Sequence, residues 1–336
     1  MIPKASGGAG VGAGDRGDTG SGRTVEPGGA AAGRFSGLPL RILSDGDLDA
    51  IHAETLKVLE QTGVFVEDDT ARDIFADGGA SVDRETGMVR LPGEVVEAAI
   101  AACPPDDDEP VTFSNFDEGV MYVDPRSGER REPRTADAAD AALLVDALPN
   151  IDSYGAAVRP TDVPAVTAAV HGCEAALLST TKQVGTEATS GWEVRVCAEL
   201  GACITGSLDA LRDDPVVGFS TCPVSPLKLP RDATEVIVEC ARLGLSDTIV
   251  SMAMAGGSAP VTLAGTLVVH NAEVLAGITV AQLTEPGARV VYGSSTTAMD
   301  LRFATASVGS PEMALIGAAV AQMSKQYRLP SCIAGA

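Results

Sequence analysis

The most constraining feature of this sequence is a regular alternation of short apolar runs and longer helix-like runs, which starts near residue 151. We expect the apolar runs to be strands at 152–158, 183–187, 216–221, 248–254, 289–293 and 332–334. Their starts are 31 to 43 residues apart, which is the length of one strand–helix unit. Such apolar strands are typical of a parallel sheet buried on both faces, joined by right-handed crossovers. The alternation therefore predicts either a doubly wound sheet or a (β/α)8 barrel.

Two observations favour the barrel. The dinucleotide-binding pattern G-x-G-x-x-G does not follow any of the expected strands. Polar, small and unusual residues instead crowd the carboxyl ends of these strands, where barrel enzymes place their chemistry. We therefore predict the α/β class, as a partial (β/α)8 TIM-type barrel of about six βα units with an N-terminal mixed helical/β region.

The number of strands is too small for a closed barrel. A complete barrel needs eight strands over roughly 250 residues, whereas 151–336 holds only six. Six units would leave two open sheet edges and an unfilled lumen. We expect 151–336 to be an incomplete barrel, preceded by a mixed α/β region at 38–150 and a disordered Gly-rich tail at 1–37.

The mixed region carries local signals of its own. Ser44 can cap a helix in which Asp47 completes a capping box. Alternating apolar residues at 111–113 and 120–123 predict a small hairpin.

Charge and cysteine usage exclude several classes of protein. Lys and Arg number 24 against 46 Asp and Glu, so the net charge of −22 argues against binding to nucleic acid or anionic membranes. The seven cysteines are odd in number, irregularly spaced and free of a C-x-x-C pattern, which argues against a disulfide scaffold or a zinc ribbon. Reduced thiols in a cytoplasmic protein are the expectation. The longest apolar run, 263–283, contains His270, Asn271, Glu273 and Gln282 and predicts a buried helix rather than a membrane span.

Several short motifs follow one another in an order that resembles a known family. They are DALPNID at 146–152, RPTDVP at 159–164, CPVSPL at 222–227, APVTLAG at 259–265, NAE at 271–273 and PE at 311–312. In this order and spacing the chain resembles the trimethylamine:corrinoid methyltransferase family, from about Leu38 to the last residue.

The resemblance implies a (β/α)8 barrel enzyme, a methyltransferase that acts on a small methylated amine. In that family the methyl group passes to Co(I) of a corrinoid (cobalamin) that a separate corrinoid protein supplies, so no cofactor is bound directly. Some members carry pyrrolysine, encoded by an amber codon, just beyond the sixth strand. The present sequence halts at about that place, which motivates the hypothesis of an amber codon taken as a stop, in which case the fragment as written would lack activity. A short or cut homologue is the alternative.

Other functions stay open at this point. The chain could be a pyrrolysine-free, glycine-betaine-type corrinoid methyltransferase, or an inactive remnant that docks a corrinoid protein. A Schiff-base aldolase on the same barrel would need a lysine at a strand's carboxyl end. Lys182 starts a strand and Lys228 lies in a loop, so this alternative is weak. A homo-oligomer is also compatible with the sequence.

Two carboxylates are the catalytic candidates. Glu187 ends the second expected strand and could orient a cation in the lumen, although an ion pair with an arginine such as Arg159 would explain it equally. Asp300 follows the fifth strand, and its alternative is a helix cap or a loop salt bridge.

The substrate-binding candidates are aromatic residues and one glycine. Tyr154, Phe219 and Tyr292 lie in expected strands and could form a wall for a methylammonium group, although core layers are the commoner use. Gly256 could let a ligand approach the backbone, or could serve a tight turn. We expect no metal site, because the pair His270 and Glu273 lacks a visible third ligand.

Overall fold

The computed structural model describes residues 40–106, 111–116 and 118–335, all within one compact unit. The tail predicted at 1–37 lies outside the described residues. The described residues on both sides of residue 150 belong to the same compact unit. The division into an N-terminal region and a barrel region at that residue therefore stays a prediction.

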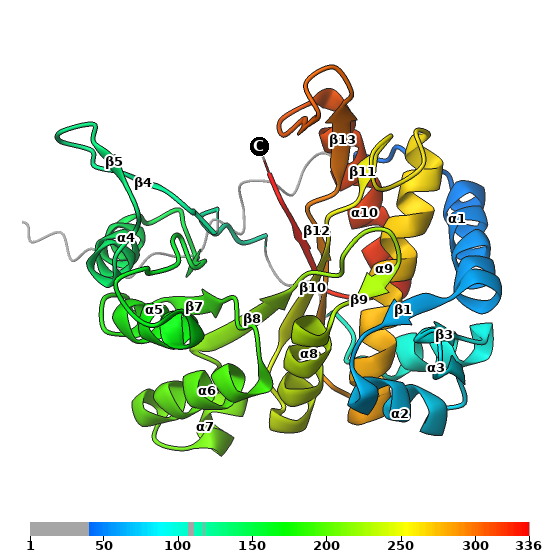
Figure 1. Cartoon of the computed structure of the whole chain (residues 1–336), viewed down its shortest axis with the longest axis horizontal. Helices are drawn as coiled ribbons and strands as arrows, with labels where there is room; N and C mark the ends of the chain where they lie inside the picture. Colours follow the sequence, from blue (N-terminus) through cyan, green and yellow to red (C-terminus); the bar gives the residue numbers. More distant parts are fainter. Residues whose placement is uncertain (1–39, 107–110, 117, 336) are drawn as a thin grey trace, which may run out of the picture. The chain divides into compact units, whose positions relative to one another are not determined.

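A six-stranded parallel sheet forms the centre of this unit (Figure 1). Its strands are β6 (Ser153–Tyr154), β7 (Gln183–Thr186), β8 (Val217–Thr221), β10 (Asp247–Ser251), β12 (Val290–Ser294) and β15 (Ser331–Ile333). Their order in the sheet is the same as their order along the chain, and every pairing is parallel. Because the order never reverses, right-handed crossovers place all connecting helices on one face, as in a barrel. A doubly wound sheet would need a reversal, so the partial-barrel prediction is confirmed.

The helices that follow these strands begin at conventional caps. They are α5 (Ala168–Leu177), α6 (Gly191–Thr205), α8 (Arg231–Leu243), α9 (Leu263–Thr284) and α10 (Pro311–Tyr327). Ser190, Thr262 and Ser310 each accept a backbone N–H from the first turn of α6, α9 and α10. The start of α9 therefore agrees with the helix expected at 263–283. A short helix, α7 (Leu208–Asp213), follows α6 and was not predicted.

Helix α9 is the central helix of the fold, because it packs between the sheet and the N-terminal region. It contacts β10 and β12 on one side and α1 (Asp45–Lys57), α2 (Asp69–Asp77) and α3 (Gly93–Ala102) on the other. Within the described ranges it is the one helix that is long and apolar enough to cross a membrane, and 78% of its most apolar window is buried inside the protein. The expected buried helix at 263–283 is therefore confirmed.

The N-terminal region is attached to the central part through a second, smaller sheet. Its order is β2 (Ser81–Asp83), β3 (Met88–Arg90), β1 (Val64–Val66) and β9 (Lys228–Leu229). Strand β9 belongs to the loop after β8 and runs parallel to β1. The predicted capping box is present at α1, where Ser44 and Asp47 bond to each other's backbone N–H.

The predicted hairpin at 111–113 and 120–123 is wrong in its pairing. The hairpin is instead formed by β4 (Tyr122–Val123) and β5 (Arg130–Arg131), which precede α4 (Thr135–Ala147). The segment that begins at residue 111 has a different partner. Its residue Ser114 forms a parallel bridge with Ser153 along the outer edge of β6.

This segment also corrects the expectation of two open sheet edges. The side chain of Asn115 bonds to both backbone groups of Gly155, at 2.9 Å each, and Gly119 bridges Val158. The edge of β6 is therefore partly covered. Among the described strands, β15 pairs only with β12, so the edge prediction is retained for β15.

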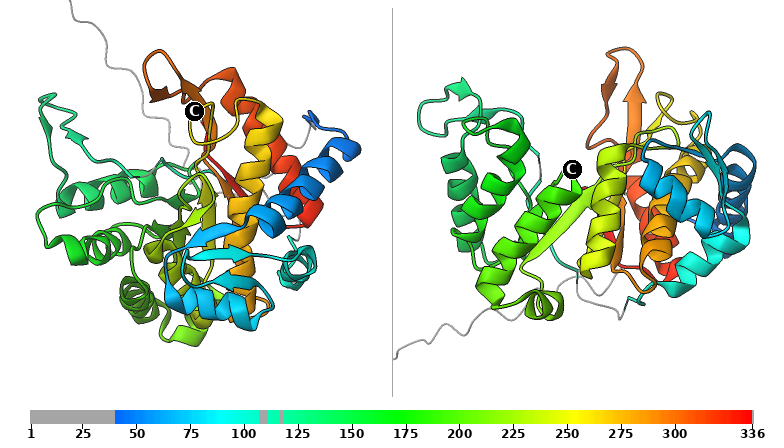
Figure 2. Two further views of the ribbon diagram at one scale, coloured as in Figure 1. Left: turned by 45° about the vertical axis from the view of Figure 1, so that its right-hand side comes forward. Right: turned by 60° about the horizontal axis from the view of Figure 1, so that its bottom comes forward.

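Long loops after β10 and β12 form a third sheet. Its strands are β11 (Met254–Ala255), β13 (Thr297–Asp300) and β14 (Thr305–Ala306). They project beyond the carboxyl ends of the central strands (Figure 2).

Candidate functional site

The two faces of the central sheet differ in what their side chains contact. Thr186, Phe219, Asp247 and Val290 are consecutive partners across four strands, and all four are buried. The residues that follow three of them alternate to the opposite face. On that face Ser220, Thr248 and Val291 form a half-buried row. The connecting helices therefore cover the first face, whereas the second face is only half-buried along this row.

The aromatic candidates do not line a common space. Phe219 belongs to the buried, helix-facing row and is 3% exposed. Tyr292 is fully buried, and its hydroxyl donates to Asn271 Oδ1 at 2.7 Å, while burial raises its pKa. Both residues thus occupy core positions, which was the alternative for them. Tyr154 is also buried, but it lines a pocket.

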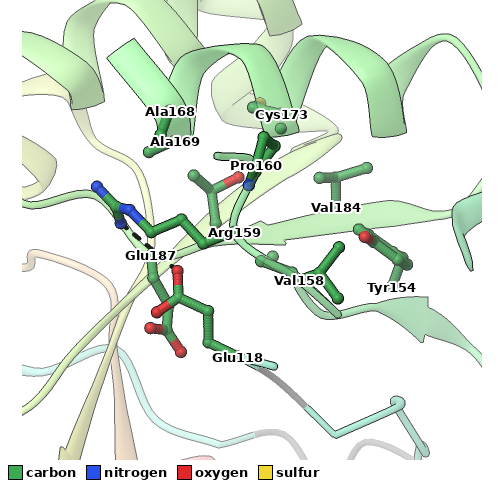
Figure 3. Close-up of a pocket in the computed structure, with 14 residues that line it drawn as sticks. Glu118, Tyr154, Val158, Arg159, Pro160, Ala168, Ala169, Cys173, Val184 and Glu187 are labelled. Carbon is green, nitrogen blue, oxygen red and sulfur yellow. Dashed lines mark hydrogen bonds and ion pairs between the residues drawn. The ribbon is translucent and has the colours of Figure 1, made fainter. Parts of the chain in front are cut away.

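This small pocket lies at the carboxyl ends of β6 and β7 and has a cavity volume of about 20 Å³ (Figure 3). Its polar side chains are Glu118, Arg159 and Glu187. Its remaining wall is mainly apolar and comes from the ends of β6 and β7 and from α5. That wall includes Tyr154, Val158, Pro160, Ala168, Ala169, Cys173 and Val184.

Glu187 reaches the pocket from the carboxyl end of β7. It directly follows Thr186, the last residue of the strand, and both residues line the pocket. Figure 3 shows its carboxylate beside the carboxylate of Glu118 and below the guanidinium of Arg159. The structure places Glu187 directly after β7, as the sequence indicated, and its orientation toward the lumen stays a prediction.

The pocket carries an excess of negative charge. Arg159 Nη1 lies 3.5 Å from Glu118 Oε1, and the two side chains are 29% and 24% exposed. The charged lining is one guanidinium and two carboxylates, a composition that suits a cation. Glu118 was missed at the sequence level because it lies in an irregular segment with no periodicity. Arg159 was named only as an ion-pair partner.

Asp300 and Gly256 do not line this pocket. The Oδ1 atom of Asp300 accepts the backbone N–H groups of Arg302 and Phe303 at 2.8 and 3.2 Å, which orders the turn after β13. Gly256 has a φ of +81° in the tight turn after β11. Gly256 therefore has the turn role that was its alternative, whereas Asp300 orders a turn through backbone hydrogen bonds rather than through the helix cap or salt bridge considered above.

A buried polar cluster underneath the loop after β8 was not predicted. Glu273 on α9 accepts hydrogen bonds from Ser225 Oγ, Ser251 Oγ and Leu227 N at 2.8, 2.6 and 2.9 Å. Burial raises the pKa of Glu273, although these three donors act in the opposite direction. The cluster fixes the loop that carries β9 to the end of β10.

His270 and Glu273, considered above as a metal pair, have other partners. His270 Nδ1 lies 3.1 Å from Thr296 Oγ1, and burial lowers the pKa of His270 to about 3, so the ring is neutral. In the described part of the chain, no group of three or more His, Cys, Asp or Glu side chains is arranged to hold a metal ion.

The two lysines considered for a Schiff base are also held elsewhere. Lys182 Nζ donates to the carbonyls of Val145 and Leu148, and Lys228 pairs with Glu67 at 2.5 Å. Neither lysine lines the pocket, so the structure gives the aldolase alternative no support.

Comparison with known proteins identifies relatives over almost the whole chain. The family model "Trimethylamine methyltransferase (MTTB)" matches residues 30–336. Trimethylamine methyltransferase MttB of Desulfitobacterium hafniense is 41% identical, over 91% of this chain and 64% of that protein. The MttB of Methanosarcina thermophila is 39% identical, over 90% of this chain and 66% of that protein. A glycine betaine methyltransferase of D. hafniense is 30% identical, over 86% of this chain and 63% of that protein.

A solved structure is also similar, namely the monomethylamine methyltransferase MtmB of Methanosarcina barkeri. It superimposes with a TM-score of 0.48 at 13% identity, covering 85% of this chain and 67% of that chain. The chain therefore spans about two thirds of the length of these proteins, and 64% to 66% of the two MttB relatives.

Proposed function

The chain belongs to the trimethylamine methyltransferase (MTTB) family, and from this premise we propose that it acts in methyl transfer from a trimethylamine-like substrate to a corrinoid protein. The family match over residues 30–336 carries this proposal. The pocket supports it, because two carboxylates at the strand ends suit a positively charged amine.

The proposed reaction moves one methyl group and balances without a further reactant. The substrate nitrogen is protonated or quaternary, so its C–N bond breaks with the electron pair left on nitrogen and a neutral amine leaves, and Co(I) of the corrinoid would supply the electron pair of the new bond to the methyl carbon. The products are a methyl–Co(III) corrinoid and the demethylated amine. The role proposed for this chain is to hold the methylated nitrogen through Glu187 and to exclude water with the apolar wall.

The partners follow from the same proposal. A separate corrinoid protein supplies the cobalamin, so this chain binds no cofactor directly, and a small methylated amine is the substrate. We also propose a cytoplasmic location. It is supported by the seven cysteines, all within the described residues, among which no disulfide is formed.

A glycine-betaine-like substrate is the second candidate, and one observation favours it. Arg159 lies in the same pocket as Glu187 and Glu118, so the pocket offers a guanidinium for a carboxylate next to carboxylates for a quaternary ammonium. The 30% identical relative is a glycine betaine methyltransferase.

Replacing Glu187 with glutamine should weaken binding of trimethylammonium about tenfold, because the substitution removes a charge-assisted contact worth roughly 1.5 kcal/mol. Binding is measured by saturation-transfer NMR on the whole chain, with trimethylammonium and glycine betaine as separate probes. Glu199→Gln is the matched control, since Glu199 is exposed on α6.

The two substrates are distinguished by Arg159→Gln. If the chain binds betaine through Arg159, this change lowers the affinity for betaine and spares trimethylammonium.

Equal affinity of trimethylammonium for the native chain and for Glu187→Gln would refute the proposed role of Glu187.

A further inference from the structure

Two buried cysteines on neighbouring helices contact each other behind the candidate pocket. Cys173 on α5 and Cys197 on α6 are 3% and 0% exposed, and their side chains are hydrogen-bonded to each other. We propose that Cys173 and Cys197 form a modification site, at which a peroxide produces a reversible disulfide that joins α5 to α6. This inference does not depend on the proposed methyl transfer.

The surroundings of the pair favour a disulfide over other fates of the thiols. Both cysteines belong to one apolar cluster that also contains Val184, Val194 and Ala198. Apolar packing on adjacent helices holds the two side chains in one buried environment. The charged or titratable groups that act on the pair are Glu174 and Glu193 on the same helices and Cys240 on α8, and Thr186 of β7 bonds to Cys173.

The pocket gives a small oxidant access to one of the two thiols. Cys173 lines the pocket, and Figure 3 places it on the helix above Pro160. Cys197 does not line it. Cys173 is therefore the thiol that the oxidant reaches first.

The chemistry balances with hydrogen peroxide as the oxidant. The thiolate of Cys173 attacks one peroxide oxygen, the O–O bond breaks, and a sulfenic acid and water result after proton transfer. The sulfur of Cys197 then attacks the sulfenic sulfur, the S–O bond breaks, and the hydroxyl leaves as a second water with the thiol proton. Two thiols and one peroxide thus give one disulfide and two waters, and an external thiol reverses the bond by exchange.

The cross-link would connect two elements that border the pocket. Helix α5 supplies Ala168, Ala169 and Gly172 to its wall, and α6 begins at Gly191, four residues after Glu187. The only tryptophan in the chain, Trp192, is the second residue of α6 and is 46% exposed. Its fluorescence therefore reports a displacement of the end of α6 that lies near the pocket.

The test is applied to the native full chain. The exposed cysteines, Cys203, Cys222 and Cys332, are first alkylated with iodoacetamide under native conditions. The protein is then treated with a small excess of hydrogen peroxide, digested without reduction and analysed by mass spectrometry. We expect a peptide pair joined through Cys173 and Cys197, with the mass of two hydrogen atoms lost, and its disappearance after a phosphine reductant. Trp192 fluorescence should shift on oxidation and return on reduction.

Three variants show whether the effect belongs to this pair. Cys173→Ala and Cys197→Ala should each abolish the cross-link and the fluorescence shift, whereas Cys240→Ala should retain both. The first measurement uses the chain with its natural sequence. The proposal can therefore be tested even if a variant fails to fold. The proposal is overturned if native protein treated with peroxide keeps Cys173 and Cys197 alkylatable after unfolding, or if either of them joins Cys240 instead.

Discussion

Replacing Glu273 with alanine is expected to destabilise the protein by about 3 kcal/mol, because it leaves buried donors without an acceptor. The Ser225 and Ser251 hydroxyls and the Leu227 N–H all donate to the carboxylate, and Glu273 is 1% exposed. Each unsatisfied buried group costs roughly 1 to 3 kcal/mol, so the losses are large even where water partly replaces the carboxylate. Urea unfolding followed by circular dichroism measures the change.

A double-mutant cycle separates the lost hydrogen bonds from a lost volume. Ser251→Ala should destabilise the native protein, yet it should cost much less when Glu273 is already alanine, because the shared bond is gone. Glu199→Ala, at an exposed position on α6, should change the unfolding free energy by less than about 0.5 kcal/mol. If the costs of Glu273→Ala and Ser251→Ala simply add, the carboxylate does not hold the loop after β8 in the manner described.

The parts of the fold that the sequence predicts well are those with a local physical cause. The capping box of Ser44 and Asp47 requires only residues three apart, and it is present. The apolar run that became α9 is longer than a strand and begins after the capping residue Thr262, so its type and start follow from the sequence. The order of the six strands follows from their spacing and from the handedness of the crossovers.

The face to which each strand residue points could not be predicted in the same way. In β8 both faces carry small or apolar residues, so the pattern of Val217 to Thr221 gives no sign of which side meets the helices. Phe219 and Tyr292 were named as substrate-binding residues for this reason, whereas the register places them in helix-facing rows. Glu187 was singled out because a charged residue directly after an apolar strand is unusual, and its role in the site stays a prediction.

The sequence also did not predict contacts between segments that lie far apart along the chain. Asn115 bonds to the backbone of Gly155, and Glu118 pairs with Arg159, each across about forty residues of sequence. No periodic pattern precedes either contact, and the alternation at 111–113 suggested a local hairpin instead. Tertiary partners decided the conformation of this segment, as they commonly do for short strand-like sequences.

Replacing Asp247 with asparagine is expected to make the stability of the protein less dependent on pH. Asp247 begins β10, is fully buried among apolar neighbours, and accepts one hydrogen bond from Thr221 at 2.8 Å. Within the described structure its Oδ1 atom has no hydrogen-bond partner. Burial therefore raises the pKa of Asp247 to about 7, whereas an aspartate in an unfolded chain titrates near pH 4.

The sign of the effect follows from proton linkage. Between about pH 4 and pH 7 the folded protein keeps the Asp247 proton that the unfolded chain loses, so stability falls by about 1.4 kcal/mol per pH unit. The contribution is fully present below pH 4 and is lost once the pH exceeds 7. Asparagine does not ionise. The free energy of unfolding of the variant, relative to that of the native protein, should therefore rise by about 3 kcal/mol when the pH is raised from 5 to 8.

Urea unfolding at pH 5, 6, 7 and 8 measures this difference directly. Asp213→Asn is the matched control, because Asp213 is exposed at the end of α7 and its substitution should shift the free energy of unfolding equally at all four pH values. A stability difference between Asp247→Asn and the native protein that stays constant across the series would mean that Asp247 is ionised at pH 5. In that case an unseen polar partner, such as a buried water at Oδ1, must compensate its burial.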